Sequence, residues 1–189
     1  VPQKEWPKTS PIKAGGFHFS TVLDYAKAYR DGTTTPEEVA KKVLDAIEAS
    51  NAAIPPLRAM IEVRRDDILR QAREATQRIQ EGRALSIFDG VPVAVKDEID
   101  VAGYHTTVGT SFLGKAPALE DATIVARMRA AGAWLIGKTN MHEIGINVTG
   151  LNPHHGTTRN PYNTDHYTGG SSSGSATAVA AGLVPVALG

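Results

Sequence analysis

Two segments of the sequence carry side chains that could do chemistry. Lys96 ends the apolar run Val91–Val95, where burial disfavours the charged form of an amine, and a neutral lysine can act as a general base. The turn Thr168–Ala176 places serine hydroxyls and glycine N–H groups before small residues, a pattern that can stabilise negative charge at the start of a helix. Ordinary structural roles remain open: Lys96 could reach water or pair with Asp97, and the turn could be a linker.

Other catalytic motifs fit this sequence poorly. Residues 170–174 match the G-x-S-x-G pattern of the α/β-hydrolases, with Ser172 as the nucleophile. That pattern needs a buried strand before it and a later Asp and His, whereas residues 163–167 are polar and the last histidine is His166. Neither a Walker A loop nor the dinucleotide-binding glycine motif is present.

Metal ligation has little support in the sequence. His142-Glu143 begins like a zinc-protease helix, but position 146 is isoleucine, so the second histidine is missing. His154 and His155 are adjacent and lack a carboxylate at ligand spacing. The chain has no cysteine, which excludes disulfides, thiolate nucleophiles and cysteine-bound metals. We expect no metal site.

Composition narrows the class of protein further. The 189 residues carry 20 basic and 20 acidic side chains, which argues against nucleic-acid binding. The longest uncharged apolar run, Ala178–Gly189, is too short to span a bilayer and contains Pro185, so no integral membrane segment is expected. No signal peptide is apparent at the start, which favours the cytoplasm without deciding the compartment.

The elements that must position Lys96 and the serine turn alternate between helices and strands. Ser20 is the expected N-cap of a first helix, with Val22, Leu23, Ala26 and Tyr29 on its apolar face. Thr35, Pro36 and Glu38 predict the start of a second helix. The remaining expected elements are strand 60–63, helix 66–81, strand 91–95, a helix capped by Asp121 and running to 128, strand 133–136, an irregular segment 139–168, helix 173–181 and strand 183–188.

This alternation predicts an α/β fold with a largely parallel or mixed sheet. We divide the chain into an extended arm at residues 1–16, a mainly helical part at 17–88 and a core at 89–189, all within one domain. The last strand ends at Gly189 with nothing to cover it, so we expect the sheet to be incomplete in this chain.

Four ordered motifs resemble the amidase signature family. They are Gly90–Asp97, Gly137–Glu143, Arg159–Pro161 and Gly169–Ala176. The resemblance implies a layered α/β/α fold with a mixed central sheet, and amide hydrolysis by a Ser–Ser–Lys triad through an acyl-enzyme intermediate, with no cofactor.

The resemblance also implies roles for individual residues. Lys96 would be the base, and Ser171 the bridging serine after a cis Gly170–Ser171 peptide bond. Gly169, Gly170, Ser172 and Met141 would form the oxyanion and substrate-binding surroundings. Ser173 stands where family members often carry glycine. In the family, the nucleophilic serine follows the strand that matches residues 183–188. We therefore expect the nucleophile to be absent from this chain, and the chain to be inactive without the C-terminal part.

The substrate is expected to be a small-molecule amide. The segment 152–161 and the helix around Leu23–Tyr25 are more similar to fatty acid amide hydrolase-like members than to the glutamine amidotransferases of the family. Two alternatives stay open: one half of a split amidase or amidotransferase, and a non-catalytic module that binds anions at the Ser171 turn. A homodimer is one candidate assembly.

Overall fold

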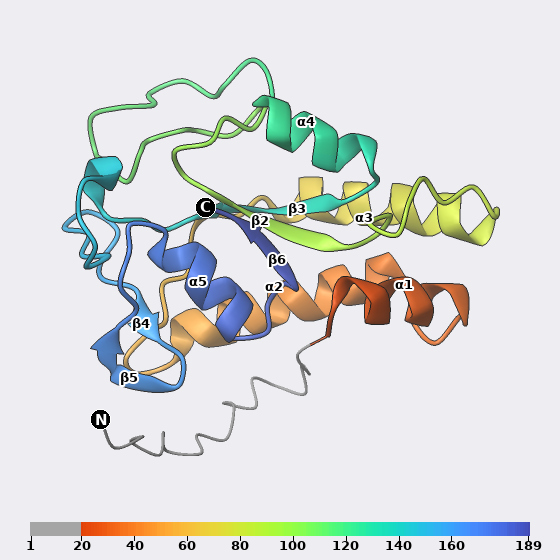
Figure 1. Cartoon of the computed structure of the whole chain (residues 1–189), viewed down its shortest axis with the longest axis horizontal. Coiled ribbons are helices and arrows are strands. Elements are labelled where there is room, and N and C mark those ends of the chain that lie inside the picture. The colour runs from red at the N-terminus through yellow and green to blue at the C-terminus, as the bar shows by residue number, and fades with distance from the viewer. Residues whose placement is uncertain (1–19) are drawn as a thin grey trace, which may run out of the picture.

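The chain folds around a four-stranded mixed sheet (Figure 1). The computed structural model describes residues 20–189, so the arm predicted at 1–16 lies outside the described residues. Strands β3, β2 and β6 run parallel, while β1 is antiparallel to β3. The order across the sheet is β1 (Met60–Glu62), β3 (Trp134–Thr139), β2 (Pro92–Lys96) and β6 (Val186–Leu188).

The two central strands are buried on both faces. Every residue of β2 and of β3 is buried. Because side chains alternate along a strand, Val93 and Val95 join one apolar cluster while Ala94 joins the other. This explains why the sequence of β2 is continuously apolar and not alternating.

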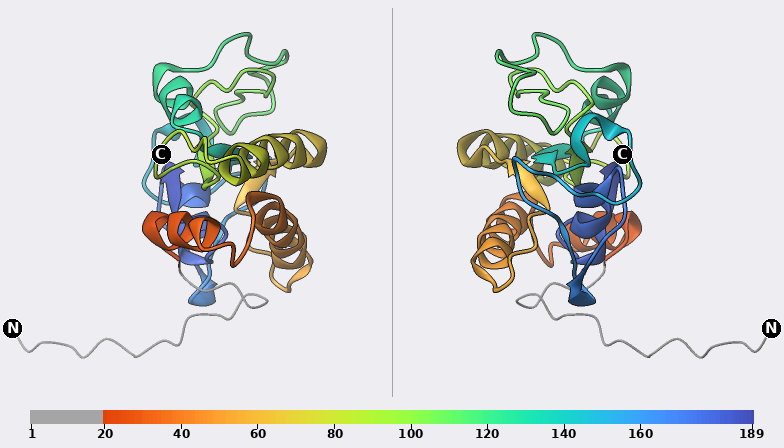
Figure 2. Two further views of the ribbon diagram at one scale, coloured as in Figure 1. Left: turned by 90° about the vertical axis from the view of Figure 1, so that its right-hand side faces the viewer. Right: turned by 90° about the vertical axis from the view of Figure 1, so that its left-hand side faces the viewer.

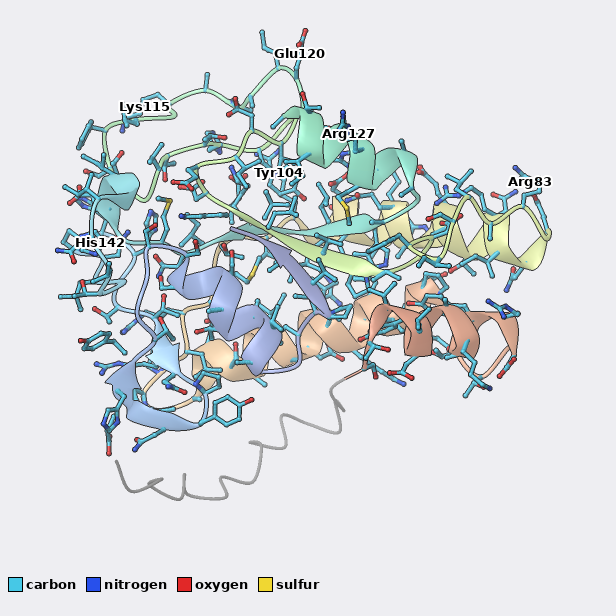
Figure 3. The ribbon with its side chains drawn as sticks, viewed as in Figure 1. Arg83, Tyr104, Lys115, Glu120, Arg127 and His142 are labelled. Atoms are coloured by element: carbon cyan, nitrogen blue, oxygen red, sulfur yellow. The ribbon has the colours of Figure 1, made fainter. Side chains whose placement is uncertain are left out.

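Helices cover both faces of the sheet. On one side lie α1 (Val22–Arg30), α2 (Pro36–Ala52) and α5 (Ser173–Ala180). On the other lie α4 (Thr123–Ala130) and the loop that precedes it (Figures 1 and 2). Tyr104, from this loop, lies between the sheet and α4 (Figure 3). The remaining helix, α3 (Arg65–Gln80), packs against α2 and β3. The predicted α/β/α layering with a mixed sheet is confirmed.

Capping residues fix where the first two helices begin. Thr35 and Glu38 form the predicted capping box of α2. The predicted cap of α1 at Ser20 is wrong, because the capping box is formed by Thr21 with Asp24. Only Thr21 has an acidic residue three positions later, and this is what the reciprocal hydrogen bonds require.

The apolar face of α1 differs from the predicted stripe. Leu23 is 65% exposed, whereas Tyr25 and Tyr29 are buried. The Tyr29 hydroxyl donates a hydrogen bond to the Gly90 carbonyl (2.8 Å), and the Trp134 indole Nε1 donates to the same oxygen (2.7 Å). Burial raises the pKa of Tyr29, so the phenol stays a donor. The Tyr29 bond fastens α1, and the Trp134 bond fastens β3, to the residues just before β2.

Two further expectations are corrected. Asp121 does not cap α4, whose N-cap is Ala122 without a side-chain hydrogen bond. Asp121 instead accepts from the backbone N–H of Ala102 and pairs with Arg129. The segment expected to be irregular, 139–168, contains a hairpin and a short 3-10 helix. These elements are β4 (Arg159–Asn160), β5 (Asn163–Tyr167) and η1 (Glu143–Gly145).

The helices of the described region are too short or too polar to cross a membrane. The boundary placed at residues 88 and 89 stays a prediction.

Candidate active site

Lys96 and Ser171 meet at the carboxyl end of the sheet. Lys96 is the last residue of β2, and Ser171 lies in the turn before α5. The Lys96 Nζ donates a hydrogen bond to the Ser171 Oγ at 2.9 Å across 75 positions of sequence. The lysine side chain is only 4% exposed. A buried amine in contact with a serine hydroxyl can exchange a proton with it.

Hydrogen bonds from α5 hold the serine turn against the strand ends. The Ser175 Oγ lies 2.8 Å from the Thr139 Oγ1 at the end of β3, and it donates to the Leu188 carbonyl of β6 at 3.0 Å. The Gly174 N–H donates to the Asn140 carbonyl at 2.8 Å. The first turn of α5 is thus tied to two strands, and this fixes where Ser171 lies.

Gly174 must be a glycine in this arrangement. A Cβ at this position would lie 2.3 Å from the Ala59 carbonyl oxygen and 2.4 Å from the Asn140 nitrogen. Both are backbone atoms that cannot move aside easily. The neighbouring Ser173 is fully buried and accepts a hydrogen bond from the Thr158 hydroxyl at 3.2 Å, which accommodates a serine there.

The glycines before Ser171 shape the turn. Gly169 has a φ of +80°, a conformation that favours glycine. The Gly170–Ser171 peptide bond is cis, as the resemblance implied. A Cβ on Gly170 would lie 2.7 Å from the Gly150 nitrogen, so this glycine lets two loops approach closely. The Ser171 carbonyl accepts from the His142 N–H at 2.9 Å, and His142 lies at this end of the sheet (Figure 3).

Met141 and Ser172 lie beside the Ser171 turn. A Cβ on Gly145 would lie 3.5 Å from the Met141 Cε and 3.9 Å from the Ser171 Oγ. Ser172 is the N-cap of α5 and makes no side-chain capping bond. A Cβ on Gly189 would lie 3.0 Å from the Ser172 Oγ. The structure therefore gathers the candidate residues around the Ser171 hydroxyl.

Glu98 is a site residue that the sequence reasoning missed. Its Oε1 lies 2.9 Å from the Lys96 Nζ, and its Oε2 would be 3.1 Å from a Cβ on Gly145. Its side chain is 37% exposed. The carboxylate two positions after Lys96 was a usable signal in the sequence, beside that of the adjacent Asp97.

A second lysine, Lys138, forms a fully buried ion pair with Asp97. Their charged atoms are 3.3 Å apart, and the side chains are 0% and 1% exposed. Burial lowers the pKa of Lys138, and the charge of Asp97 acts against that decrease. Asp97 also accepts from the Thr107 side chain and from the Gly109 N–H. The expected alternative pairing of Asp97 with Lys96 is therefore wrong.

The loop beside the site presents apolar side chains to solvent. Gly150 packs against the serine turn, since a Cβ there would lie 2.3 Å from the Gly169 carbonyl oxygen. Four apolar residues of this loop are exposed: Ile144, Ile146, Val148 and Leu151. Gly145, in the same loop, would place a Cβ 3.9 Å from the Ser171 Oγ, so the loop that carries these side chains adjoins the Lys96–Ser171 pair.

The histidines of the loop are hydrogen-bonded or partly buried. His154 Nε2 lies 2.7 Å from the Glu143 Oε1, and His142 Nδ1 lies 3.2 Å from the Thr149 hydroxyl. Burial lowers the pKa of His155. Within residues 20–189, no three His, Cys, Asp or Glu side chains are grouped as a metal ion would need.

Comparison with known families agrees with the motifs. The amidase family model matches residues 38–189. This chain belongs to the amidase family. The similarity first indicated by the four motifs is thereby confirmed.

Curated relatives of this amidase-family chain have several names. A fatty acid amide hydrolase of Oryza sativa subsp. indica is 42% identical over all 189 residues, and one of Arabidopsis thaliana is 44% identical over 92% of the chain. A glutamyl-tRNA(Gln) amidotransferase subunit from Cupriavidus taiwanensis is 43% identical over 90% of the chain. The chain spans 31%, 29% and 33% of these relatives, respectively.

Solved amidase structures share the fold. A peptide amidase bound to the competitive inhibitor chymostatin has a TM-score of 0.85 and 35% identity, with 91% of this chain and 36% of that one covered. A bacterial aryl acylamidase has a TM-score of 0.83 and 31% identity, covering 92% of this chain and 36% of its own.

Proposed function

We propose that this chain is part of an amide hydrolase and contributes Lys96 and Ser171 to a Ser–Ser–Lys triad. The observation that carries the proposal is the 2.9 Å contact between a buried lysine amine and the Ser171 hydroxyl. Family membership supports it, since the named relatives include fatty acid amide hydrolases and a peptide amidase.

Proton transfer along the triad follows from this contact. Neutral Lys96 accepts the proton of the Ser171 hydroxyl, and Ser171 accepts the proton of a nucleophilic serine as that serine attacks the amide carbonyl. Backbone N–H groups of residues 169–172 would stabilise the oxyanion. Ser171 then donates its proton to the leaving amine as the C–N bond breaks, and water hydrolyses the acyl-enzyme.

The nucleophile is proposed to lie outside these 189 residues. The chain covers about a third of the relatives that it matches. Gly189 approaches the Ser172 hydroxyl, so polypeptide following Gly189 would start beside the Lys96–Ser171 pair. Ser172 is not assigned the nucleophilic role, because the residues before its turn form the exposed, polar β5.

The acyl group of the substrate is proposed to be a fatty acyl chain. The loop whose Gly145 approaches Ser171 exposes the apolar side chains of Ile144, Ile146, Val148 and Leu151, and exposed apolar side chains suit contact with a long hydrocarbon. Similarity to the plant fatty acid amide hydrolases points the same way.

Hydrolysis by the full-length polypeptide tests the proposal. We would compare a long-chain acyl amide, acetamide and glutamine, and expect the acyl amide to be preferred. Lys96→Ala and Ser171→Ala should each lower kcat about 10²- to 10⁴-fold, the contribution typical of general acid–base groups. Lys115→Ala is the matched control, because Lys115 is an exposed loop lysine (Figure 3) whose amine donates to the Ser111 carbonyl. Full activity in Lys96→Ala would refute the triad.

The 189-residue chain alone is proposed to be inactive. Hydrolysis of a chromogenic amide by the purified chain, abolished by Lys96→Ala, would show that a nucleophile lies within it. Preference for glutamine would instead favour the amidotransferase alternative, for which the similarity to the Cupriavidus taiwanensis protein is the supporting observation.

A further inference from the structure

We propose that Glu98 determines which leaving amines the amidase accepts. Its carboxylate favours amides whose amine portion carries a positive charge and disfavours amides whose amine portion carries a carboxylate. The inference rests on the proposed function, because it concerns the amine to which Ser171 donates a proton. It goes beyond that function by naming the residue that selects the leaving group and the chemical class of that group.

Glu98 lies close to the hydroxyl that must protonate the leaving amine. The Glu98 Oε1 is 2.9 Å from the Lys96 Nζ, which is itself 2.9 Å from the Ser171 Oγ. The second oxygen, Oε2, faces Gly145, where a Cβ would be 3.1 Å from this oxygen and 3.9 Å from the Ser171 Oγ. Both oxygens therefore lie within about 7 Å of the Ser171 hydroxyl, a range over which charges in a partly buried site attract or repel each other.

The space beside Gly145 suits the amine portion of a substrate. The Glu98 Oε2, the Met141 Cε and the Ser171 Oγ all converge on the position that a Cβ of residue 145 would take, and glycine leaves that position free. In the part of the chain that the structure describes, Oε2 accepts no hydrogen bond. A leaving amine beside Ser171 would thus meet the Met141 methyl group and a carboxylate oxygen that can still accept.

The charge that a substrate meets at this position is negative. The Glu98 side chain is 37% exposed and the Lys96 side chain 4%, so a group arriving from solvent contacts the carboxylate before the buried amine. The neighbouring carboxylates are paired, Asp97 with Lys138 and Glu143 with His154. A cation on the leaving amine would be attracted to Glu98, whereas an anion at the same place would be repelled.

Matched substrates isolate this effect of charge. All carry the same dodecanoyl chain, and their amine portions end, after two methylene groups, in trimethylammonium, in the neutral tert-butyl group of the same shape, or in a carboxylate. For the full-length protein we expect kcat/KM to fall in that order, with the cationic amide about tenfold above the neutral one. Water and salt at the exposed side of Glu98 keep the preference to this size. In Glu98→Gln the cationic and neutral amides should be hydrolysed equally well, and the anionic amide should gain relative to the neutral one.

Ratios measured at one pH separate specificity from catalysis. An effect of Glu98→Gln on the Lys96–Ser171 pair or on the fold changes kcat/KM for all three amides alike, so it cancels from the ratios. Glu98→Asp should keep most of the preference for the cationic amide, because it keeps the charge. Glu143→Gln is the matched control: it removes another carboxylate near the site, one that pairs with His154, and should leave the ratios at their wild-type values.

A binding measurement judges Glu98 without hydrolysis. The full-length Ser171→Ala variant keeps Lys96 and Glu98 and lacks the hydroxyl of the relay. Calorimetry on this variant should show the trimethylammonium amide bound about tenfold more tightly than the tert-butyl amide, and adding Glu98→Gln should abolish the difference. Ratios that Glu98→Gln leaves unchanged in either measurement would overturn the role of Glu98. Hydrolysis that survives Lys96→Ala would overturn the triad instead, and the binding ratios would still judge Glu98.

Discussion

Replacing Asp97 with asparagine should destabilise the fold by about 3–5 kcal/mol, the usual cost of removing one partner of a buried ion pair. The magnitude follows from the complete burial of Lys138, which is 0% exposed. Its remaining partners would be neutral, namely the His105 carbonyl at 2.8 Å and the Thr106 hydroxyl at 3.0 Å. Asparagine keeps the size of the side chain, so the loss measures the charge and the hydrogen bonds that the carboxylate accepts from Thr107 and Gly109, and not a cavity.

The free energy of unfolding lost in Asp97→Asn should become smaller as the pH rises. Because burial lowers the pKa of Lys138, the unfolded chain binds more protons than the folded one between that lowered pKa and the unfolded value of about 10.4. The free energy of unfolding therefore rises with pH across this window. Removing Asp97 removes an influence that raises the pKa of Lys138. In Asp97→Asn the pH range between the folded and unfolded pKa of Lys138 therefore extends to lower pH. The free energy of unfolding lost through the substitution should shrink as the pH approaches about 10.

Urea denaturation gives the measurement. Trp134 is buried in the sheet, so its fluorescence can follow unfolding once Trp6 is replaced by phenylalanine. A loss of about 4 kcal/mol lowers the midpoint by about 2 M for a slope near 2 kcal/mol/M. Glu37→Gln, which breaks the surface pair with Lys41, should change the free energy of unfolding by less than about 0.5 kcal/mol. A loss for Asp97→Asn as small as that of the control would refute the reasoning.

Three further changes have defined outcomes. Gly174→Ala should cost about 1–3 kcal/mol or more, because its Cβ would overlap two backbone atoms; an unchanged thermal midpoint would contradict the packing described for α5. Thr35→Ala should cost about 1 kcal/mol and lower Tm by about 2–4 °C through loss of the capping box, while Thr33→Ala, outside that box, should not. Tyr29→Phe should cost about 0.5–1.5 kcal/mol by removing the bond to Gly90. Since burial raises the pKa of Tyr29, its phenol stays protonated and this cost should be the same at pH 7 and pH 9; a cost that changed between them would count against a buried donor.

The elements that can be predicted from the sequence are those set by neighbouring residues in the chain. The central strands are recognisable from continuous apolar residues, and α2 from the capping residues Thr35 and Glu38. The hairpin β4–β5 was missed because its residues are polar and half-buried or exposed, so no apolar period marks it. Asp121 was misassigned because its partner Arg129 lies two turns farther along α4.

Some residues of the candidate site could likewise be predicted from the sequence, and others could not. Lys96 and Ser171 were identified as a pair from ordered motifs, although 75 positions separate them. Glu98 carried a local signal, since it lies two positions after Lys96, whereas the Lys138–Asp97 pair was not foreseen because it depends on which side chains the fold brings within about 3 Å of a buried amine. Such pairings depend on the tertiary structure and leave no periodic signal in sequence.

The way α5 is attached has a consequence for how this region tolerates amino-acid variation. Its inner side, Ser173 to Ser175, touches strands and loops through hydrogen bonds and backbone contacts, whereas Ala176 and Val179 are exposed. A saturation library across this helix should accept many residue types at the two outer positions and almost none at the inner ones. Directed evolution aimed at new substrates would therefore gain little from randomising the inner side of α5.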